Sequence, residues 1–105
     1  MMSNPNTIDI IAEDPETGKL LLVMTEDRPW KSAVLHQQFL AKANAYANYV
    51  LSESFSQDQP GFTPQQVIIK LDCAHAPGES TLAVFNQARQ ELQRHGIDFQ
   101  YEVCG

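Results

Sequence analysis

Polar and reactive side chains gather at three points of the sequence, each at the end of an apolar stretch. In chain order they are Glu26, Asp27, Arg28 and Trp30; Asp72, Cys73 and His75; and Cys104. Carboxylates act as general bases or metal ligands, a guanidinium binds anions through paired hydrogen bonds, and Cys and His bind zinc. If the fold brings the three segments together, they form one candidate site for a small molecule or a metal.

The residues of the hexapeptide TEDRPW also have ordinary structural interpretations. Asp27 is a candidate N-cap for the helix that follows, because Asp is among the residues preferred there. Arg28 is expected to pair with a neighbouring carboxylate in so acidic a chain. Trp30 is the only Trp of the chain, and a single Trp at such a junction often closes the end of a core. We favour the structural interpretation for all three residues and keep ligand binding as the alternative.

Cys73, His75 and Cys104 raise the question of a metal or redox site. They supply at most three ligands and lack the tight paired spacing of structural zinc sites, so we predict no metal site. A disulfide between Cys73 and Cys104 is geometrically conceivable, but a reducing cytoplasm argues against it. We predict two buried or half-buried thiols. Neither cysteine lies in a C-x-x-C redox motif.

Several motifs that would indicate catalysis are absent from the sequence. It contains no glycine-rich phosphate loop, no H-E-x-x-H pair and no G-x-S-x-G turn. We therefore predict no catalytic residue and no cofactor, and a non-enzymatic protein is favoured over an enzyme.

The periodicity of apolar residues predicts the elements that position these segments. Two-residue alternation predicts strands at residues 7–14, 19–26, 66–72 and 97–103. A period near 3.6 residues predicts helices over residues 30–55 and 80–96. A polar loop at 52–64 is expected to connect the first helix to the third strand. Lys42 is expected outside the centre of the first helix's apolar face. Phe99, Tyr101 and Val103 are expected to point inward.

The predicted order is β-β-α-β-α-β, which indicates an α/β (α+β two-layer) fold with a mixed four-stranded sheet. The first two strands form an antiparallel hairpin around D-P-E-T-G, in which Gly18 takes a positive φ angle. The last three strands are joined through helices and are expected to run parallel with right-handed crossovers. Their carboxyl ends would then meet, where open α/β sheets bind ligands. A single domain at 7–105 after a flexible lead-in at 1–6 is expected.

The charge of the chain limits its partners. There are 13 acidic and 7 basic residues among 105, a formal charge of −6. No cluster of Lys and Arg could displace counterions from a phosphate backbone, so nucleic acid is not expected as a partner. No apolar run approaches the roughly 20 residues that span a bilayer, so no membrane association is expected. The N-terminus lacks the features of a secretory signal, and a cytoplasmic protein is predicted.

Four stretches of the sequence resemble a family of small bacterial proteins of unknown function. They are IDIIAEDPETGKLLLVMTEDRPW, NAYANYV within the long helix, VIIKLDCAHAP and HGIDFQYEV. In that family a D-P-x-T-G hairpin turn leads to an M-x-E-D-R-P-W motif. The resemblance implies a stand-alone single-domain bacterial protein and supplies no activity, cofactor or catalytic residue.

Our leading hypothesis is a non-enzymatic protein-interaction or binding module, with self-association as a homodimer included. The segment AKANAYANYV of the long helix offers small and aromatic residues for such contacts. The first alternative is a small-molecule or metal site at the carboxyl ends of the strands. The second is an acidic inhibitor or immunity-type protein that binds a basic enzyme.

Overall fold

The computed structural model describes residues 8–104. The predicted lead-in at 1–6 lies outside these residues. The elements follow in the order β1 (Ile10–Glu13), β2 (Leu20–Glu26), α1 (Ala33–Val50), α2 (Glu53–Asp58), η1 (Pro64–Gln66), β3 (Val67–Cys73), α3 (Glu79–Gln93) and β4 (Asp98–Val103). The predicted β-β-α-β-α-β order is confirmed, with a short extra helix and a 3₁₀ turn before β3. None of the described helices is both long and apolar enough to cross a membrane.

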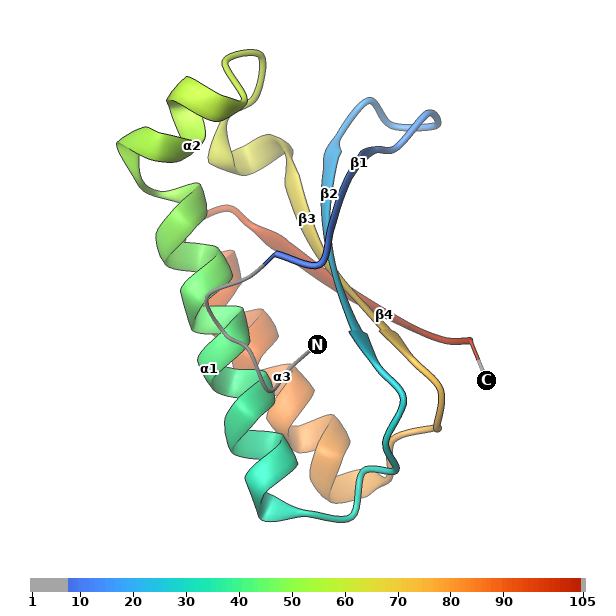
Figure 1. The fold of residues 1–105 in the computed structure, drawn as a ribbon. Coiled ribbons are helices and arrows are strands. Elements are labelled where there is room, and N and C mark those ends of the chain that lie inside the picture. The colour runs from blue at the N-terminus through green and yellow to red at the C-terminus, as the bar shows by residue number, and fades with distance from the viewer. Residues whose placement is uncertain (1–7, 105) are drawn as a thin grey trace.

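The four strands form one mixed sheet in the order β1-β2-β3-β4. β1 is antiparallel to β2, whereas β2, β3 and β4 run parallel. α1 and α3 lie side by side on the same face of this sheet, and no described helix covers the opposite face (Figure 1). Because the three parallel strands end at the same side of the molecule, the segments that follow them meet there. We call this side the carboxyl end of the sheet.

The β1–β2 hairpin turns through D-P-E-T-G as predicted. The Asp14 carboxylate accepts a hydrogen bond from the backbone N–H of Glu16 at 3.0 Å and another from the Thr17 hydroxyl at 2.9 Å. Gly18 then takes a φ of 71°, which a residue without a Cβ adopts with little strain. The turn fixes the register in which Ile10 lies opposite Val23.

The main core lies between the sheet and the two long helices. Leu22, Met24, Ile69 and Leu71 are fully buried on the helix side of the sheet, as two-residue alternation requires. The helices add a cluster of aromatic rings that includes Phe39 of α1 and Phe85 of α3, whose centroids are 5.0 Å apart. Phe99 of β4 completes the cluster, 5.9 Å from Phe85.

α1 is shorter than the sequence indicates. It begins at Ala33 rather than Trp30 and ends at Val50, and its N-cap is Ser32, whose hydroxyl accepts a hydrogen bond from the Val34 N–H at 3.1 Å. Asp27 is therefore not the cap, and that prediction is wrong. Pro29 lies in the loop before the helix, and the residue preceding a proline is disfavoured in helical geometry, so a later start is natural.

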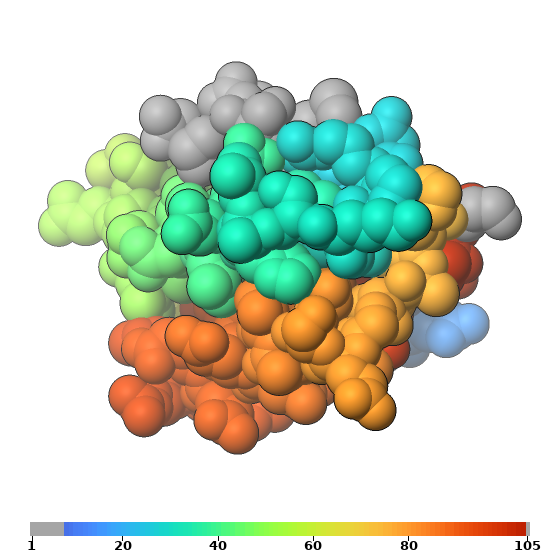
Figure 2. Space-filling view, turned by 90° about the horizontal axis from the view of Figure 1, so that it is seen from below, coloured from blue at the N-terminus to red at the C-terminus, as the bar shows by residue number. Residues whose placement is uncertain are grey.

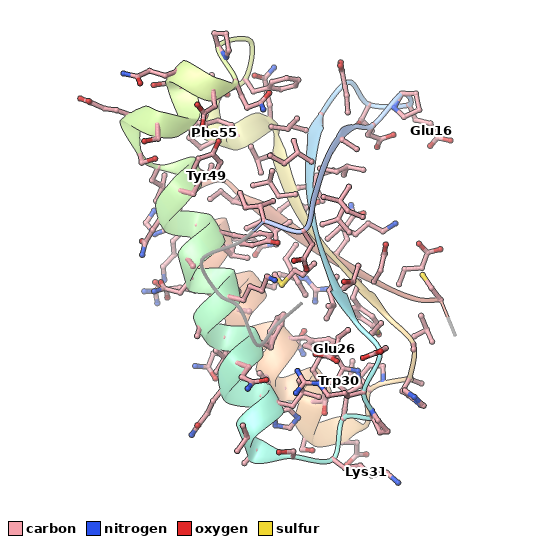
Figure 3. The ribbon with its side chains drawn as sticks, in the orientation of Figure 1. Glu16, Glu26, Trp30, Lys31, Tyr49 and Phe55 are labelled. Atoms are coloured by element: carbon pink, nitrogen blue, oxygen red, sulfur yellow. The ribbon has the colours of Figure 1, made fainter. Side chains whose placement is uncertain are left out.

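The predicted loop at 52–64 contains the six-residue helix α2. The Ser52 hydroxyl caps it by accepting a hydrogen bond from the Phe55 N–H at 3.4 Å. Phe55 is buried and meets the ring of Tyr49 edge-on, with 5.6 Å between centroids. Figure 3 shows these two side chains together where α1 gives way to α2. Phe55 therefore belongs to the main core.

One feature of α1, the position of Lys42, differs from the periodicity analysis. Lys42 is fully buried, not at the margin of the helix, and its Nζ lies 2.9 and 3.0 Å from the two carboxylate oxygens of Asp9. Tyr46 is also buried, and its hydroxyl donates to the carbonyl oxygen of Val23 at 3.3 Å while accepting from the Asp9 N–H at 3.1 Å. Of the two tyrosines of AKANAYANYV, Tyr46 therefore packs internally, whereas Tyr49 is only partly buried beside the core.

β4 is only partly covered by the helix layer. Phe99 is buried as expected, whereas Tyr101 and Val103, on the same face, are 37% and 45% exposed. The prediction that these two residues point into the core is thus right about the face and wrong about burial. α3 packs on β4 through Phe85, whose ring centroid lies 5.1 Å from that of Tyr101, but it leaves Tyr101 and Val103 partly exposed. β4 is therefore an edge strand with exposed apolar side chains.

Candidate functional site

The loop TEDRPW leaves the carboxyl end of β2 and contains a buried ion pair. Glu26 continues the alternation of β2 and points to the helix side, where its carboxylate is fully buried. Arg28 folds back over it, with Nε 2.9 Å from Oε2 and Nη2 2.6 Å from Oε1. The backbone N–H of Arg28 adds a third hydrogen bond at 3.0 Å, and Nη2 also reaches the side-chain oxygen of Gln38 at 2.9 Å. This arrangement fixes the loop against α1.

The electrostatics of this pair follow from the geometry. Burial alone would raise the pKa of Glu26, but the hydrogen bonds and the positive charge of Arg28 outweigh it and hold that pKa below its ordinary value. The hydrogen bond from the guanidinium to Glu26 raises the pKa of Arg28 in turn. Both groups are therefore charged at neutral pH. Glu26 is engaged by Arg28 and is not a free general base, so the pair is structural.

Trp30 closes the core at the carboxyl end of the sheet. Its ring meets Phe85 edge-on at 5.2 Å and Phe39 edge-on at 6.3 Å, and it is buried. The indole N–H donates to the carbonyl oxygen of His75 at 3.1 Å. Figure 3 shows Glu26 and Trp30 together at this end of the molecule. Trp30 thus has the structural role that we favoured, and His75 contributes its backbone to that contact.

The loops after β2 and β3 pack against each other. Figure 2 looks at this end, where the residues after β2 and the start of α1, in cyan to green, lie directly against the residues after β3 and the start of α3, in orange. The backbone also joins the two segments, since the Ala74 N–H donates to the Glu26 carbonyl oxygen at 2.9 Å. The two loops therefore pack together on the surface that Figure 2 shows.

A pocket of about 290 Å³ lies at the carboxyl end of the sheet. It is lined by Thr25, Glu26, Asp27, Asp72, Cys73, Ala74 and Cys104. Of the predicted ligand-binding residues, Glu26, Asp27 and Asp72 line this pocket, whereas Arg28, Trp30 and His75 do not. The parallel strands thus bring the three predicted segments to one place, but only part of the set faces the same space.

Beside the pocket, Lys70 lies between two carboxylates on the helix-free face. Its Nζ is 2.9 Å from a Glu102 oxygen and 3.3 Å from Asp72 Oδ1. That Asp72 oxygen is solvent-inaccessible and accepts no hydrogen bond from the described residues, so Lys70 supplies its compensating charge. The hydrogen bond to Glu102 raises the pKa of Lys70, partial burial opposes it, and Asp72 adds to the rise. Lys70 is therefore a stable cation.

The two thiols have different surroundings. Cys73 is buried and Cys104 is exposed, and both are free. The backbones are joined, since the Cys104 N–H donates to the Cys73 carbonyl oxygen at 2.7 Å. Burial raises the pKa of the Cys73 thiol. Partial desolvation, followed by the negative charges of Asp72 and Glu102, raises the pKa of Cys104. Both thiols are protonated at neutral pH, so neither is an activated nucleophile.

Sequence analysis missed two participants in this region, Lys70 and Glu102. Their side chains lie on the same face of the sheet as that of Asp72, and Asp72 pairs in register with Glu102 of the neighbouring strand β4. The alternation of each strand indicates the face on which these residues lie, but only the strand register shows that they are neighbours. Among residues 8–104, Asp72, Glu102 and Cys104 form a group whose metal-ligating atoms lie within 4.8 Å of one another. His75 does not belong to this group, so the weak candidate set of Cys73, His75 and Cys104 is not brought together.

A second hollow, of about 310 Å³, lies between α1 and α3. Ala43 and Ala47 of α1 and Ala88 of α3 are buried at its floor. Small side chains let the two helices approach closely, which accounts for the shape of this surface. None of the predicted site residues lies in it.

These observations define a small α+β protein with helices on one face of a mixed sheet and a pocket beyond its parallel strands. A family model matches residues 1–105, and the chain belongs to the family of unknown function DUF6572. The predicted membership in a family of unknown function is thereby confirmed. No curated protein and no solved structure matches the chain.

Proposed function

We propose that this chain is a non-enzymatic interaction module that binds another protein through the helix-free face of its sheet, called the open face below. The strand registers assign to this face Ile10, Ala12, Leu21, Val23, Thr25, Ile68, Lys70, Asp72, Asp98, Gln100 and Glu102. The observation that carries the proposal is that β2 and the beginning of β3 are apolar on both sides, while helices cover only one side of the sheet.

Parallel strands are normally covered on both faces, because their sequences are apolar throughout. Here Val23 and Ile68 are apolar open-face residues outside the helix-side core cluster. Both are buried, whereas Ile10, which pairs with Val23 in register, is 48% exposed. A partner that covers this part of the sheet would remove apolar surface from water, which is the main driving force of protein association.

The other half of the open face is polar and carries Lys70, Asp72, Asp98 and Glu102. One positive and three negative charges give this half a net negative charge. The fitting partner therefore has an apolar centre that meets Ile10 and Leu21, with basic or hydrogen-bonding groups on the side that meets β4. This geometry favours a protein surface over a small molecule.

The experiment compares capture of partners from cells that produce the protein. The bait variants are Ile10→Lys combined with Leu21→Lys on the open face, and Val34→Lys as the matched control. Val34 is 60% exposed on α1, away from the open face. We expect a partner that is captured by wild type and by the control but not by the double variant. The same partner is expected to bind the purified wild-type protein in a direct titration. Equal retention by the double variant, when circular dichroism shows it folded, would overturn the proposal.

The proposal includes a cytoplasmic, bacterial protein with the M-x-E-D-R-P-W motif as a family feature. Two free thiols, one of them exposed, support a reducing compartment. Fractionation of the producing cells tests the location, and recovery of the protein in an oxidising compartment would refute it.

A second candidate function is binding of a divalent cation at the carboxyl end of the sheet. The specific observation is that ligand atoms of Asp72, Glu102 and Cys104 lie within 4.8 Å of one another, beside the pocket. Zinc accepts such oxygen and sulfur ligands, and binding would displace Lys70 and the thiol proton. Titration calorimetry with Zn²⁺ is expected to show binding that Cys104→Ser weakens and Asp72→Asn abolishes. No binding heat with wild type, or unchanged binding by both variants, would exclude this function.

A further inference from the structure

The free edge of β4 has no partner strand in the described sheet. β4 pairs only with β3, and the Cys104 N–H donates toward β3 at the Cys73 carbonyl oxygen. Because backbone groups alternate in direction along a strand, the even-numbered residues face β3 and the odd-numbered residues face outward. Phe99, Tyr101 and Val103 therefore direct their N–H and C=O groups away from the sheet.

The three outward positions are not equivalent. The backbone groups of Phe99 already have hydrogen-bond partners within the same chain. Its N–H donates to the neighbouring Asp98 carboxylate at 3.0 Å, and its carbonyl oxygen accepts from Arg89 Nε at 3.4 Å. Tyr101 and Val103 have exposed side chains as well as outward backbone groups. A free edge of this kind, without proline, lysine or a bulge, is a template for another strand.

We infer that β4 pairs with the β4 strand of a second copy of this chain, antiparallel and with Tyr101 on the twofold axis, to form one continuous eight-stranded sheet. In this register Tyr101 lies opposite Tyr101 of the other copy, and Val103 lies opposite Phe99. Each Phe99 exchanges its local contacts for backbone bonds to the other strand. A pairing of β4 with β1 instead would be heterologous and would not close into a dimer.

The charged side chains of β4 favour the register centred on Tyr101. On the open face, Glu102 of one copy lies opposite Gln100 of the other, and Gln100 is paired in register with Lys70. No like charges are directly opposed. A register centred on Glu102 would place the two Glu102 carboxylates against each other, which destabilises an antiparallel pair. The dimer also extends the open face across both copies, so it is compatible with the proposed partner surface but does not depend on it.

The first test blocks the edge. Val103→Pro removes an outward N–H without removing a bond to β3, and Val103→Thr is the matched control that keeps both the N–H and the branched side chain. We expect sedimentation equilibrium up to about 100 µM to show a wild-type dimer of micromolar affinity, because an edge-only interface is small. Val103→Thr should retain it and Val103→Pro should weaken it at least about tenfold. A wild type that stays monomeric, or a Val103→Pro variant that associates like wild type, overturns the inference.

The second test checks the register with charge. Gln100→Lys places a cation opposite Glu102 of the other copy and is expected to tighten the dimer. Gln100→Glu places a carboxylate there and is expected to weaken it, roughly twofold to thirtyfold for the two symmetric pairs. Within one copy the effects are reversed, because residue 100 lies beside Lys70. Fold stability measured by urea at low concentration should therefore move opposite to association. Changes of the dimer in the same direction for both variants would refute the register.

Discussion

The indole N–H of Trp30 donates a hydrogen bond to the carbonyl oxygen of His75 at 3.1 Å. This bond joins the loop that leaves β2 to the loop that leaves β3, at the place where open α/β sheets bind ligands. Trp30 also fills the end of the core against Phe39 and Phe85. Together with the buried pair of Glu26 and Arg28, it makes TEDRPW a structural closure of the molecule.

The first prediction concerns the two contributions of Trp30. Trp30→Ala removes a buried aromatic ring and is expected to lower the free energy of unfolding by about 3–5 kcal/mol. Trp30→Phe keeps most of the ring packing and loses the bond to His75, so a smaller loss of about 1–2 kcal/mol is expected. Urea denaturation followed by circular dichroism measures both, because the variants lack the only Trp. Equal losses for the two variants would show that the hydrogen bond, not the packing, dominates.

The second prediction concerns Glu26 and Arg28. Arg28→Ala leaves a fully buried carboxylate without its guanidinium. Glu26→Gln leaves the guanidinium of Arg28 without its carboxylate, but that side chain is 41% exposed and water can solvate it. We expect Arg28→Ala to destabilise the fold by about 1–3 kcal/mol and Glu26→Gln to destabilise it less. Chemical denaturation at pH 7 provides the comparison. A larger loss for Glu26→Gln would contradict a structural role based on burial of the carboxylate.

The third prediction is the pH dependence of the same pair. The pKa of Glu26 is lowered in the folded protein from its ordinary value of 4.5, so the unfolded chain binds the proton more tightly. The stabilisation is therefore fully present above pH 4.5 and is lost as the pH falls through the folded-state pKa. Glu26→Gln should remove this slope, so the stability difference between wild type and variant should shrink on acidification. Denaturation midpoints measured between neutral and acidic pH would show a constant difference if the pair contributes nothing.

The sequence was sufficient for the parts of the fold that depend on local periodicity. β2 and β3 are apolar on alternate sides over seven residues each, and the order of elements then requires three parallel strands. What alternation cannot indicate is how far a helix reaches along a strand. Tyr101 and Val103 lie on the predicted face of β4, yet they are 37% and 45% exposed even though the Phe85 ring of α3 lies 5.1 Å from Tyr101, so their exposure depends on tertiary packing.

Long-range polar pairing was likewise outside the reach of the sequence. Lys42 appears polar in any periodicity analysis, and its partner Asp9 is 33 residues away. Nothing local to either residue indicates that the two are buried together. The same holds for Lys70 and Glu102, 32 residues apart. In contrast, the pair of Glu26 and Arg28 is local, and it was the expected structural role for Arg28.

The fourth prediction compares two glycines with positive φ angles, Gly18 at 71° and Gly96 at 76°. A Cβ at Gly18 would meet open space, whereas one at Gly96 would lie 2.9 Å from Cγ of Gln65. Each alanine substitution is expected to cost about 1–2 kcal/mol for the left-handed backbone, with an additional loss at Gly96. Thermal unfolding of Gly18→Ala and Gly96→Ala tests the order. Adding Gln65→Ala should remove the excess at Gly96, and persistence of the excess would contradict a steric origin.

The last prediction concerns the buried ion pair of Lys42 and Asp9, which fastens the segment before β1 to α1. Burial of Lys42 is complete, and both Asp9 oxygens lie within 3.0 Å of its Nζ. Lys42→Met fits the site in length and removes the charge, so it separates electrostatics from packing. We expect it to destabilise the fold by about 1–3 kcal/mol, because it removes the cation of the pair, while Asp9 keeps the hydrogen bond from the Thr25 backbone N–H at 3.2 Å. Asp9→Asn should also destabilise the fold, because it removes the negative charge that lies opposite the buried ammonium group. The double variant removes both charges, and we expect it to be more stable than the sum of the single losses predicts, with a coupling of roughly 1–3 kcal/mol. Urea denaturation of all four proteins closes this double-mutant cycle, with circular dichroism confirming that each is folded. Strict additivity would show that the two charges do not compensate each other and that Lys42 is buried for its hydrocarbon chain alone.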